Sequence, residues 1–409
     1  MAQPLDVTAL RAQLPGLEGL VYMNTGWQGP TPQPVLQAVA EALAGEAAAP
    51  TAPPVMESRL ALVARAREAV AALIGASPEE VSLQENTTAG INLVLWGLDL
   101  RPGDEVVTTS VEHPSVAVPV LYAQRRRGIV VRTVILDASL SPQEVLERFA
   151  AQMGPRTRLL ALSHVSYRTG QLLPIAELAR MAHAAGALIL VDAAQSVGQI
   201  PVDVRSLDCD FFSFPGHKWL LGPAGTGALY VRRDLVPPLE PPLVSHRAVL
   251  DYDIVAGRLD PCRDDIAKFE LTTRSVPLLA GLVKAIELYL GLGPEAVAER
   301  CRRLADLASR LLAGIPRLQL LSPAPGAVRS GLVSFRVEGM DAWGLTAALW
   351  ERGRVVARTL PVVDGVRLSL HAFNTEEEVE RTAALVEELV RTGLPSSASS
   401  PERDAMSEL

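Results

Sequence analysis

The sequence predicts an α/β fold: a large, mostly parallel sheet with helices on both faces, plus a smaller α/β domain. Between residues 81 and 231, short apolar runs alternate with helical segments. Uninterrupted apolar strands are typical of sheets buried on both faces, and the alternation with helices indicates parallel strand order. The length of 409 residues exceeds what one compact core accommodates and predicts two domains.

The composition narrows the possible functions. The net charge of -8 argues against nucleic acid or an anionic membrane as partner. No apolar run reaches the roughly 18 residues of a membrane span, and the first 20 residues do not read as a signal peptide. The separated cysteines Cys209, Cys262 and Cys301 form no disulfide framework, so we expect a cytoplasmic location. The six histidines are dispersed, so we expect no metal site.

The N-terminal part begins with a lead-in at residues 1–20 that includes a short helix. A short strand at 21–24 and a loop at 25–30 follow. The prolines of the low-complexity run 47–54 interrupt any continuous helix and predict a loop between two helices. Apolar residues at helical spacing predict the second of these helices over 55–74.

A potential anion site follows the short strand at 81–83. Thr87 and Thr88 stand where a helix begins, ahead of the apolar run 91–96. Hydroxyl groups and free backbone amides at a helix start bind anions readily, although threonine also acts there as an ordinary helix cap.

The strands of the main sheet are predicted from apolar runs. Helices lie between several of them, with starts marked by the capping box Ser141 to Glu144 and by Pro174 before 175–185. The predicted strands are 106–109, 130–136, 159–164, 187–192, 210–214 and 227–231.

The pattern changes after residue 274, where two long helices precede a smaller α/β unit. We expect helices at 277–290, 294–313 and 342–352, strands at 331–337, 355–358 and 366–370, and a last helix capped by Thr375 with Glu378. We therefore divide the chain into four parts: a lead-in that packs on the small domain (1–20), a large cofactor-binding domain (21–273), a small domain (274–393) and a disordered tail (394–409).

Chemically useful side chains follow several strands of the main sheet. Lys218 comes shortly after an apolar strand among small residues, Asp192 ends another strand, and Gln195 lies one turn further on. His113 follows a third strand. Ligands of such sheets bind beyond the carboxyl ends of the strands, so these residues can converge on one crevice.

This set is what a pyridoxal phosphate site requires. A lysine can form a Schiff base with the aldehyde. Asp192 can pair with the ring nitrogen, His113 can stack on the ring, and hydroxyls and helix amides at Thr87 and Thr88 can hold the phosphate. Each residue alone has an ordinary explanation, and the combination in this order favours the cofactor.

The motifs that carry a family resemblance are spread along the chain: Asn86–Asn92, Glu112–His113, Val191–Gln195, Gly216–Lys218, Phe269–Glu270 with Thr273, and Arg367 with Asn374–Glu378. From about residue 20 to 393 the chain resembles the class V aminotransferase group of fold-type I pyridoxal phosphate enzymes, which includes the cysteine desulfurases. Within that group it is most similar to the cystine/cysteine C–S lyases, through Asn92–Leu100, Thr169–Gln171 and Gly216–Trp219 with Gly222–Gly225.

The resemblance implies a role for each matching residue. Lys218 would be the Schiff-base lysine and proton shuttle, and Arg367, assisted by Arg358, would bind the substrate carboxylate. Thr273 would reach the phosphate in the neighbouring subunit, so a homodimer is implied. The remaining expected contacts are Asp192 to the ring nitrogen, Gln195 to the ring hydroxyl, His113 stacked on the ring, and Thr87, Thr88 and His217 at the phosphate.

Three departures from the family pattern bear on the activity. Desulfurases carry a mobile cysteine shortly after the position of Arg358, and the segment 359–365 has none. Pro215 stands where the family often has a serine or threonine, so one phosphate-binding hydroxyl is expected to be lost. Tyr167 stands where desulfurases have an asparagine near the ring hydroxyl and where C–S lyases place a tryptophan, which favours the lyases.

We therefore expect a C–S lyase that converts cystine- or cysteine-type substrates to pyruvate, ammonia and a sulfur product. An aminotransferase or an amino-acid epimerase is the alternative, and a desulfurase or a non-catalytic binding protein is less favoured. The sequence leaves the amino-acid substrate open. We expect specificity to depend on Trp27, Gln28, Tyr167, His246, Arg247 and His371.

Overall fold

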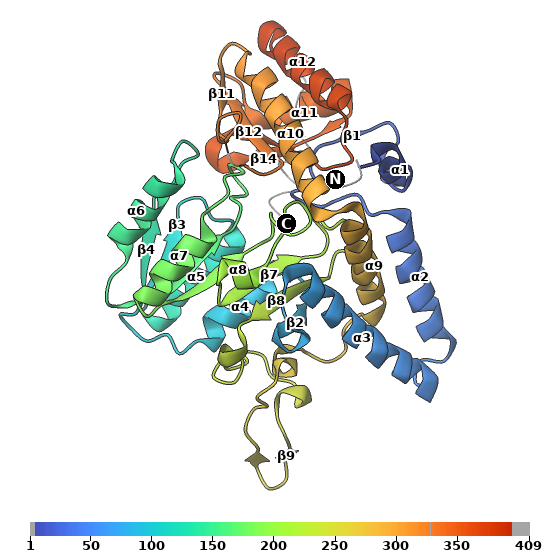
Figure 1. The fold of residues 1–409 in the computed structure, drawn as a ribbon, viewed down its shortest axis with the longest axis vertical. Coiled ribbons are helices and arrows are strands. Elements are labelled where there is room, and N and C mark those ends of the chain that lie inside the picture. The colour runs from blue at the N-terminus through green and yellow to red at the C-terminus, as the bar shows by residue number, and fades with distance from the viewer. Residues whose placement is uncertain (1–4, 328, 395–409) are drawn as a thin grey trace.

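The computed structural model describes residues 5–327 and 329–394. Apart from Leu394, the predicted disordered tail lies outside the described residues. Within the described part, a large sheet with its helices forms the body of the molecule, and a second, smaller sheet lies at one end (Figure 1).

The large sheet has seven strands and confirms the predicted α/β class. Its strand order is β2-β8-β7-β6-β5-β3-β4. The pairs from β7 through β4 are parallel, whereas β8 runs antiparallel to both β7 and β2. The strands are β2 (Val81–Gln84), β3 (Glu105–Thr109), β4 (Val130–Val134), β5 (Thr157–Ser163), β6 (Leu188–Asp192), β7 (Phe211–Pro215) and β8 (Gly227–Val231).

Alternate residues of the central strands pack into different apolar clusters. Phe212 of β7 and Val191 of β6 belong to one cluster, and Phe211 and Leu190 to another. Because successive side chains of a strand point to opposite faces, the sheet is buried on both sides. The helices that follow its strands are α4 (Thr87–Gly97), α5 (Pro114–Arg127), α6 (Pro142–Gln152), α7 (Ile175–Ala184) and α8 (Val204–Leu207).

The smaller sheet is antiparallel throughout, with strand order β11-β12-β15-β14. The predicted strand at 355–358 is in fact two short strands, of which β13 pairs in parallel with β1 near the N-terminus. The elements are β1 (Val21–Tyr22), β11 (Leu318–Leu320), β12 (Leu332–Val337), β13 (Val355–Val356), β14 (Arg358–Leu360), β15 (Gly365–Ser369), α10 (Pro294–Ala313), α11 (Ala342–Gly353) and α12 (Glu376–Thr392).

Apolar contacts cross the domain boundaries predicted from the sequence, and those boundaries remain a prediction. Val21 and Met23 belong to the predicted large domain, but they lie in the apolar cluster of the small sheet. Helix α9 (Val276–Leu292) packs against α2 (Gln33–Ala48) and α3 (Pro53–Ile74), and Leu282 joins the cluster of the large sheet.

The lead-in helix α1 (Val7–Ala12) contacts both parts of the molecule. Its Leu10 joins the cluster of the large sheet, whereas Arg11 donates to Phe373 O at 2.9 Å and pairs with Glu378 of α12 at 2.8 Å. The short 3-10 helices are η1 (Pro15–Leu17), η2 (Pro78–Glu80), η3 (Arg233–Leu235), η4 (His246–Ala248), η5 (Ile266–Phe269) and η6 (Pro361–Val363).

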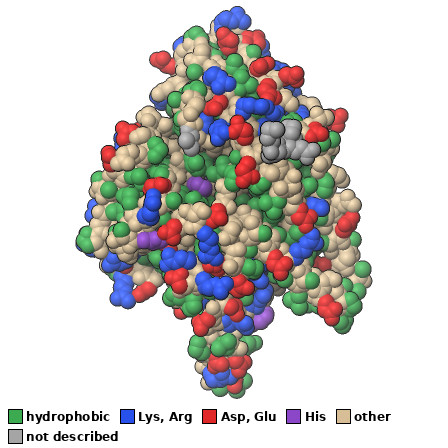
Figure 2. Space-filling view, viewed as in Figure 1, with side chains coloured by type: hydrophobic (Ala, Val, Ile, Leu, Met, Phe, Trp, Pro, Cys, Tyr) green, Lys and Arg blue, Asp and Glu red, His purple; other side chains and the backbone are tan. Residues whose placement is uncertain are grey.

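An arm projects from the large sheet, and the sequence did not predict it. It carries the two-stranded hairpin of β9 (Tyr252–Asp253) and β10 (Arg258–Leu259). Figure 1 shows it below the body, and Figure 2 shows apolar and charged side chains close together on it. Its tip exposes Ile254 by 85% and Val255 by 95%.

Within the described ranges, no single helix is long and apolar enough to cross a membrane. Helices α9 and α10 meet the length and composition criteria only as a pair, and they are bent by 78° where they join.

Candidate active site

Lys218 and Asp192 are placed by neighbouring parallel strands. Asp192 is the last residue of β6, and Lys218 follows the end of β7 by three residues. Burial lowers the pKa of the Lys218 amine to about 8; Asp192 raises it, and Arg367 and Arg358 lower it further. The amine therefore loses its proton at a much lower pH than an ordinary lysine, which favours the neutral form that a nucleophile or proton acceptor requires.

Asp192 is held in a buried setting beside a second carboxyl group. Its Oδ1 accepts the amide of Ala194 at 2.8 Å, and burial raises its pKa against the opposing effects of that amide and Lys218. Glu112 accepts Thr109 Oγ1 at 2.6 Å and Ser163 Oγ at 2.5 Å. Burial, with Asp192 contributing, raises the pKa of Glu112 to about 7, so Glu112 holds its proton to a much higher pH than an ordinary glutamate.

His113 is fixed in one tautomer at the start of α5. Its Nδ1 accepts the amide of Ser115 at 3.1 Å and lies 2.9 Å from Ser115 Oγ. Burial, then Lys218, Arg367 and Arg358, lower the pKa of His113 to about 3. The ring is therefore neutral and carries its hydrogen on Nε2. Tyr167 packs edge-on against it, with ring centroids 4.9 Å apart.

The start of α4 offers unsatisfied donors for a phosphate. Thr87 Oγ1 and His217 Nδ1 are buried and have no hydrogen-bond partner among the described residues. Thr88 Oγ1 donates to Ser115 Oγ at 2.9 Å, which links the helix start to His113. Polar atoms left without a partner inside a protein are costly, so a bound anion at this helix end satisfies both the hydroxyl and the amides.

Gln195 is used largely to hold the N-terminal loop. Its Nε2 donates to Gly26 O at 2.8 Å, and its Oε1 accepts Trp219 Nε1 at 2.9 Å. A Cβ at Gly26 would lie 2.9 Å from Gln195 Oε1 and 3.1 Å from an Arg367 nitrogen, so only glycine fits this approach. One N–H of the amide remains for the expected contact with a ring hydroxyl.

Arg367 and Arg358 stand directly opposite each other on β15 and β14. Arg367 is 3% exposed, donates to Tyr167 O at 2.9 Å, and leaves Nε buried without a partner among the described residues. Burial, with Arg358 contributing, lowers its pKa to about 9. The guanidinium of Arg358 lies 3.5 Å from the ring centroid of Trp27.

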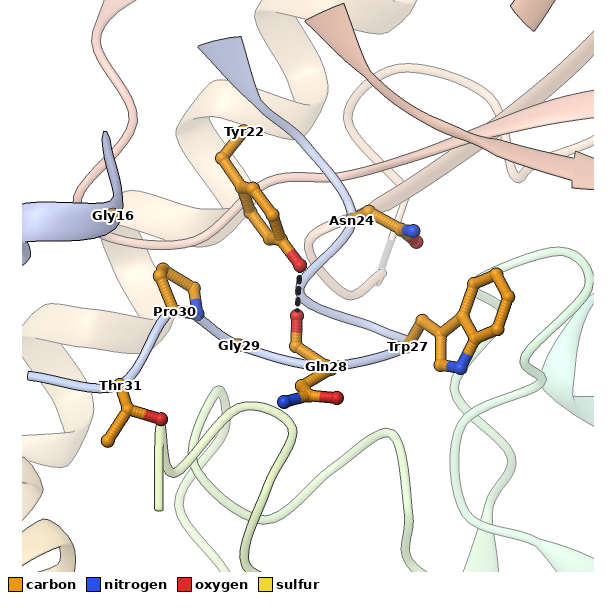
Figure 3. A pocket seen from close by; sticks show the side chains of 8 residues that line it. All are labelled: Gly16, Tyr22, Asn24, Trp27, Gln28, Gly29, Pro30 and Thr31. Carbon is orange, nitrogen blue, oxygen red and sulfur yellow. Dashed lines mark hydrogen bonds between the residues drawn. The ribbon is translucent and has the colours of Figure 1, made fainter. Parts of the chain in front are cut away.

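Residues of the loop at 24–31 line a cavity of about 430 Å³ (Figure 3). Gly29 N donates to His217 O at 2.8 Å, and the Tyr22 hydroxyl donates to Gln28 O at 2.7 Å. The cavity lining is Gly16, Tyr22, Asn24, Trp27, Gln28, Gly29, Pro30 and Thr31.

Several residues predicted from sequence lie elsewhere. Thr273 lines a different cavity of about 600 Å³, whose lining includes none of Lys218, Asp192 and Arg367. His246 and Arg247 are in η4, near the base of the arm.

His371, one of the residues on which we expect specificity to depend, is enclosed by aromatic side chains in the structure. It is 2% exposed and stacks on Phe373 and Trp219, with ring centroids 5.0 and 5.9 Å apart. Its Nε2 is also bonded to Trp219 O at 3.0 Å.

Sequence reasoning assigned no role to Ser115, Glu112 or Ser163. Glu112 stands in the Glu112–His113 motif, and Ser115 follows His113 by two residues, so both were marked only by their proximity to a predicted site residue or motif. Ser163 ends β5, opposite Asp192 in the parallel register, and only the sheet pairing brings it to Glu112.

This arrangement defines an enzyme site for an aldehyde cofactor with a phosphate. It combines a buried lysine of lowered pKa near a carboxylate, a neutral imidazole, unpartnered buried polar atoms near a helix start, and two arginines on neighbouring strands.

The comparisons identify the family. The aminotransferase class-V family model matches residues 25–382, and the chain belongs to this family. It is 35% identical to the isopenicillin N epimerase of Streptomyces clavuligerus, covering 90% of this chain and 95% of the relative. It is 32% identical to a probable cysteine desulfurase of Methanothermobacter thermautotrophicus, covering 94% and 98%.

A solved structure of the cystine C–S lyase C-DES, in complex with its product cysteine persulfide, superposes with a TM-score of 0.86. It is 31% identical, and the match covers 92% of this chain and 99% of that one. The chain is thus a pyridoxal phosphate-dependent enzyme of fold type I. The unpartnered buried atoms of Thr87 and His217 and the buried lysine on which Asp192 acts fit this cofactor.

Proposed function

We propose that the enzyme is a C–S lyase that acts on cystine or a cysteine-type substrate. The observation that carries the proposal is a complete cofactor site combined with a short β14–β15 connection that has no cysteine. The fold similarity to the cystine C–S lyase supports it.

Each residue of the site has a role in this proposal. Arg367 binds the α-carboxylate as a fork and orients the substrate. Lys218 would hold the cofactor and would accept the proton from the substrate Cα. Asp192 would pair with the ring nitrogen, and His113 would lie beside the ring with its Nε2–H as a donor. The bound cofactor acts as an electron sink for the pair left on Cα.

The overall reaction balances with one water. Loss of the Cα proton leaves an electron pair that forms a Cα=Cβ bond, and sulfur departs from Cβ with its bonding pair. Water converts the unsaturated amine to pyruvate and ammonia. From cystine, the departing group is cysteine persulfide, and no oxidant or reductant is consumed.

A desulfurase would need a thiolate to accept the sulfur. Burial raises the pKa of Cys301 to about 12 and raises that of Cys209 as well, so both thiols are inert. Cys262 lies at the arm, where it pairs across an isolated bridge with Val249. None of the three takes the place of a loop cysteine beside Arg358.

Epimerisation is the second candidate, favoured by the 35% identity to isopenicillin N epimerase. Epimerisation also begins with removal of the Cα proton, but a proton is then returned to the opposite face of Cα. Transamination is distinguished by a dependence on an added keto acid.

The test is incubation of the holoenzyme with L-cystine while pyruvate and ammonia are measured. We expect both products in equal amounts, and none above background with Lys218→Ala. Inversion or deuterium exchange at Cα without pyruvate would contradict the lyase and select the epimerase. Pyruvate that appears only with a keto-acid acceptor would select the aminotransferase.

We also propose a cytoplasmic homodimer in which Thr273 reaches the cofactor site of the second copy. Thr273 is exposed and adopts a φ of 63°, an uncommon conformation for a residue with a side chain. It lines the apolar 600 Å³ cavity together with Trp96, Leu243 and Leu271, near the exposed arm. An apolar cavity and an arm with exposed apolar side chains at its tip are the kind of surfaces that a second copy covers.

A further inference from the structure

Buried polar atoms without a partner gather where the loop that follows β1 meets β15. Asn24 and Ser369 pair there in an isolated parallel bridge, and Ser369 N donates to Met23 O at 2.7 Å. Among the described residues, the side-chain atoms at this junction that are buried and lack a hydrogen-bond partner include Asn24 Oδ1, Thr25 Oγ1, Arg367 Nε and Ser369 Oγ. Buried polar groups are nearly always hydrogen-bonded, so several unpartnered atoms in one place indicate a binding region.

Arg367 and Ser369 direct their side chains into the same region. Both belong to β15, and residues two apart in a strand point to the same face of the sheet. A Cβ built on Gly26 would lie 2.8 Å from Ser369 Oγ and 3.1 Å from Arg367 Nη2. The serine hydroxyl and this end of the guanidinium are therefore neighbours beside Gly26.

The contacts of Arg367 leave one edge of its guanidinium for a ligand. Nη1 donates to Tyr167 O at 2.9 Å, and Nε is buried without a partner among the described residues. Nε and Nη2 together form the fork that binds the two oxygens of a carboxylate. Each carboxylate oxygen can accept a further hydrogen bond, so a hydroxyl beside Nη2 is placed to donate to the oxygen that Nη2 binds.

The hydroxyl of Ser369 contributes nothing to the ligand-free protein that alanine would lack. Ser369 is 0% exposed, and a buried hydroxyl without a partner costs stability. Ser213 shows the contrast, because it is equally buried but donates to Thr87 O at 3.1 Å. The hydroxyl of Ser369 thus has a purpose only when a ligand accepts its hydrogen bond.

We propose that Ser369 is a substrate-binding residue whose hydroxyl donates to the substrate α-carboxylate held by Arg367. Together the two residues select amino acids over amines that lack this carboxylate. The inference rests on the proposed function for the position of the carboxylate at Arg367. In the competing arrangement, Ser369 only holds the N-terminal loop against β15, and its hydroxyl makes no difference between amino acids and amines.

The experiment compares two ligands that differ by one carboxylate. L-Alanine is set against ethylamine, which is alanine without that group, and the absorption change of the bound cofactor in the holoenzyme measures the Kd of each. In Ser369→Ala we expect the Kd for L-alanine to rise on the order of ten-fold, because a hydrogen bond to a charged group is lost. The Kd for ethylamine should stay within about two-fold of the wild-type value.

A matched control is Ser309→Ala in α10. Ser309 is also 0% exposed, and its hydroxyl also lacks a partner among the described residues. This variant should leave both Kd values unchanged. An unaltered Kd for L-alanine in Ser369→Ala, or an equal rise for both ligands, would overturn the proposal.

Thermal unfolding separates a binding role from a structural one. Without added amino acid, the Ser369→Ala holoenzyme should unfold at the same temperature as wild type or higher, because an unpartnered buried hydroxyl has been removed. A lower unfolding temperature would show that the hydroxyl supports the fold, and it would overturn the proposal.

The same titration distinguishes this inference from the lyase proposal, because it measures binding whatever bond is broken afterwards. If Ser369→Ala weakens L-alanine alone but the wild type forms no pyruvate from cystine, the lyase proposal fails and the role of Ser369 stands. If the wild type forms pyruvate and Ser369→Ala binds L-alanine as the wild type does, the role of Ser369 fails and the lyase stands.

Discussion

Burial sets the charge state of the individual residues in this site. It lowers the pKa values of Lys218, His113 and Arg367 and raises those of Asp192 and Glu112. The mutual repulsion of the cationic groups adds to the effect on the first three. The ligand-free site thus keeps a neutral imidazole and a lysine that loses its proton readily.

The pKa of Lys218 predicts how the apoprotein takes up its cofactor. Only a neutral amine adds to an aldehyde, so the rate of covalent attachment should rise with pH and level off above about 8, where the Lys218 amine is mostly neutral. Stopped-flow absorbance of the apoprotein mixed with pyridoxal phosphate measures this rate. Asp192→Asn should move the midpoint to lower pH, because Asp192 raises the pKa of the amine. A midpoint near the ordinary 10.5 would contradict the assignment.

The raised pKa of Glu112 predicts how the stability of the protein depends on pH. Its pKa is raised in the folded protein to about 7 from an ordinary value of 4.5, so between these values the folded state binds the extra proton. The contribution of Glu112 to the free energy of unfolding is therefore fully present below about pH 4.5. It is lost as the pH rises through about 7, and the loss amounts to up to about 3 kcal/mol. Urea unfolding of wild type and Glu112→Gln at pH 5 and pH 8 measures the difference. The variant should lose less stability than the wild type over this range, and equal losses would show that Glu112 is not protonated in the fold.

At the level of elements, the position of α4 on the sheet determines where the phosphate donors lie. Gly90 lets the first turn of this helix approach β7, where Ser213 Oγ donates to Thr87 O at 3.1 Å. A Cβ at Gly90 would overlap the Ser213 hydroxyl and lie 3.1 Å from Ser213 Cβ and 3.3 Å from Leu229 Cβ. A larger residue therefore displaces the helix start together with Thr87 and Thr88.

Gly90→Ala should accordingly destabilise the protein by about 1–3 kcal/mol and weaken cofactor retention. The matched control is Gly45→Ala in α2, where the added Cβ meets nothing within 4 Å. That change should stabilise the helix by roughly 0.5–1 kcal/mol, because alanine has the higher helix propensity. Thermal unfolding and cofactor release on dialysis measure the two effects. A Gly90→Ala protein that keeps its cofactor as well as Gly45→Ala would refute the close approach.

At the level of the whole molecule, the arm and the apolar cavity are surfaces that the single chain leaves uncovered. Ile254 and Val255 at the arm tip are among its most exposed apolar side chains. If the proposed homodimer uses this surface, their combined replacement by aspartate should convert the dimer to a monomer, because charged groups resist transfer into an apolar interface. Light scattering after size exclusion measures the mass. Val362→Asp, at an apolar residue 72% exposed in η6, is the control and should leave the mass unchanged. An unaltered mass for the arm variant would exclude this part of the interface.

The sequence predicted the class of the sheet and most of its strands, because apolar periodicity and caps are local properties. Examples are the capping boxes at Ser141 and Thr375, which the structure contains. It did not predict the hairpin arm, whose short strands have no core to face. It also missed the attachment of β1 to β13, because that pairing joins residues more than 300 positions apart.

The sequence by itself therefore determined the family, the cofactor and the chemical type of each main site residue. Only the tertiary structure decided how these groups act on one another. The opposition of Arg358 and Arg367 depends on strand register, and the tautomer of His113 depends on the amide of Ser115. The enclosure of His371 depends on packing against Trp219 and Phe373. The burial and orientation of a side chain are properties of the folded chain. They determine its pKa and its hydrogen-bond partners, which the sequence alone does not show.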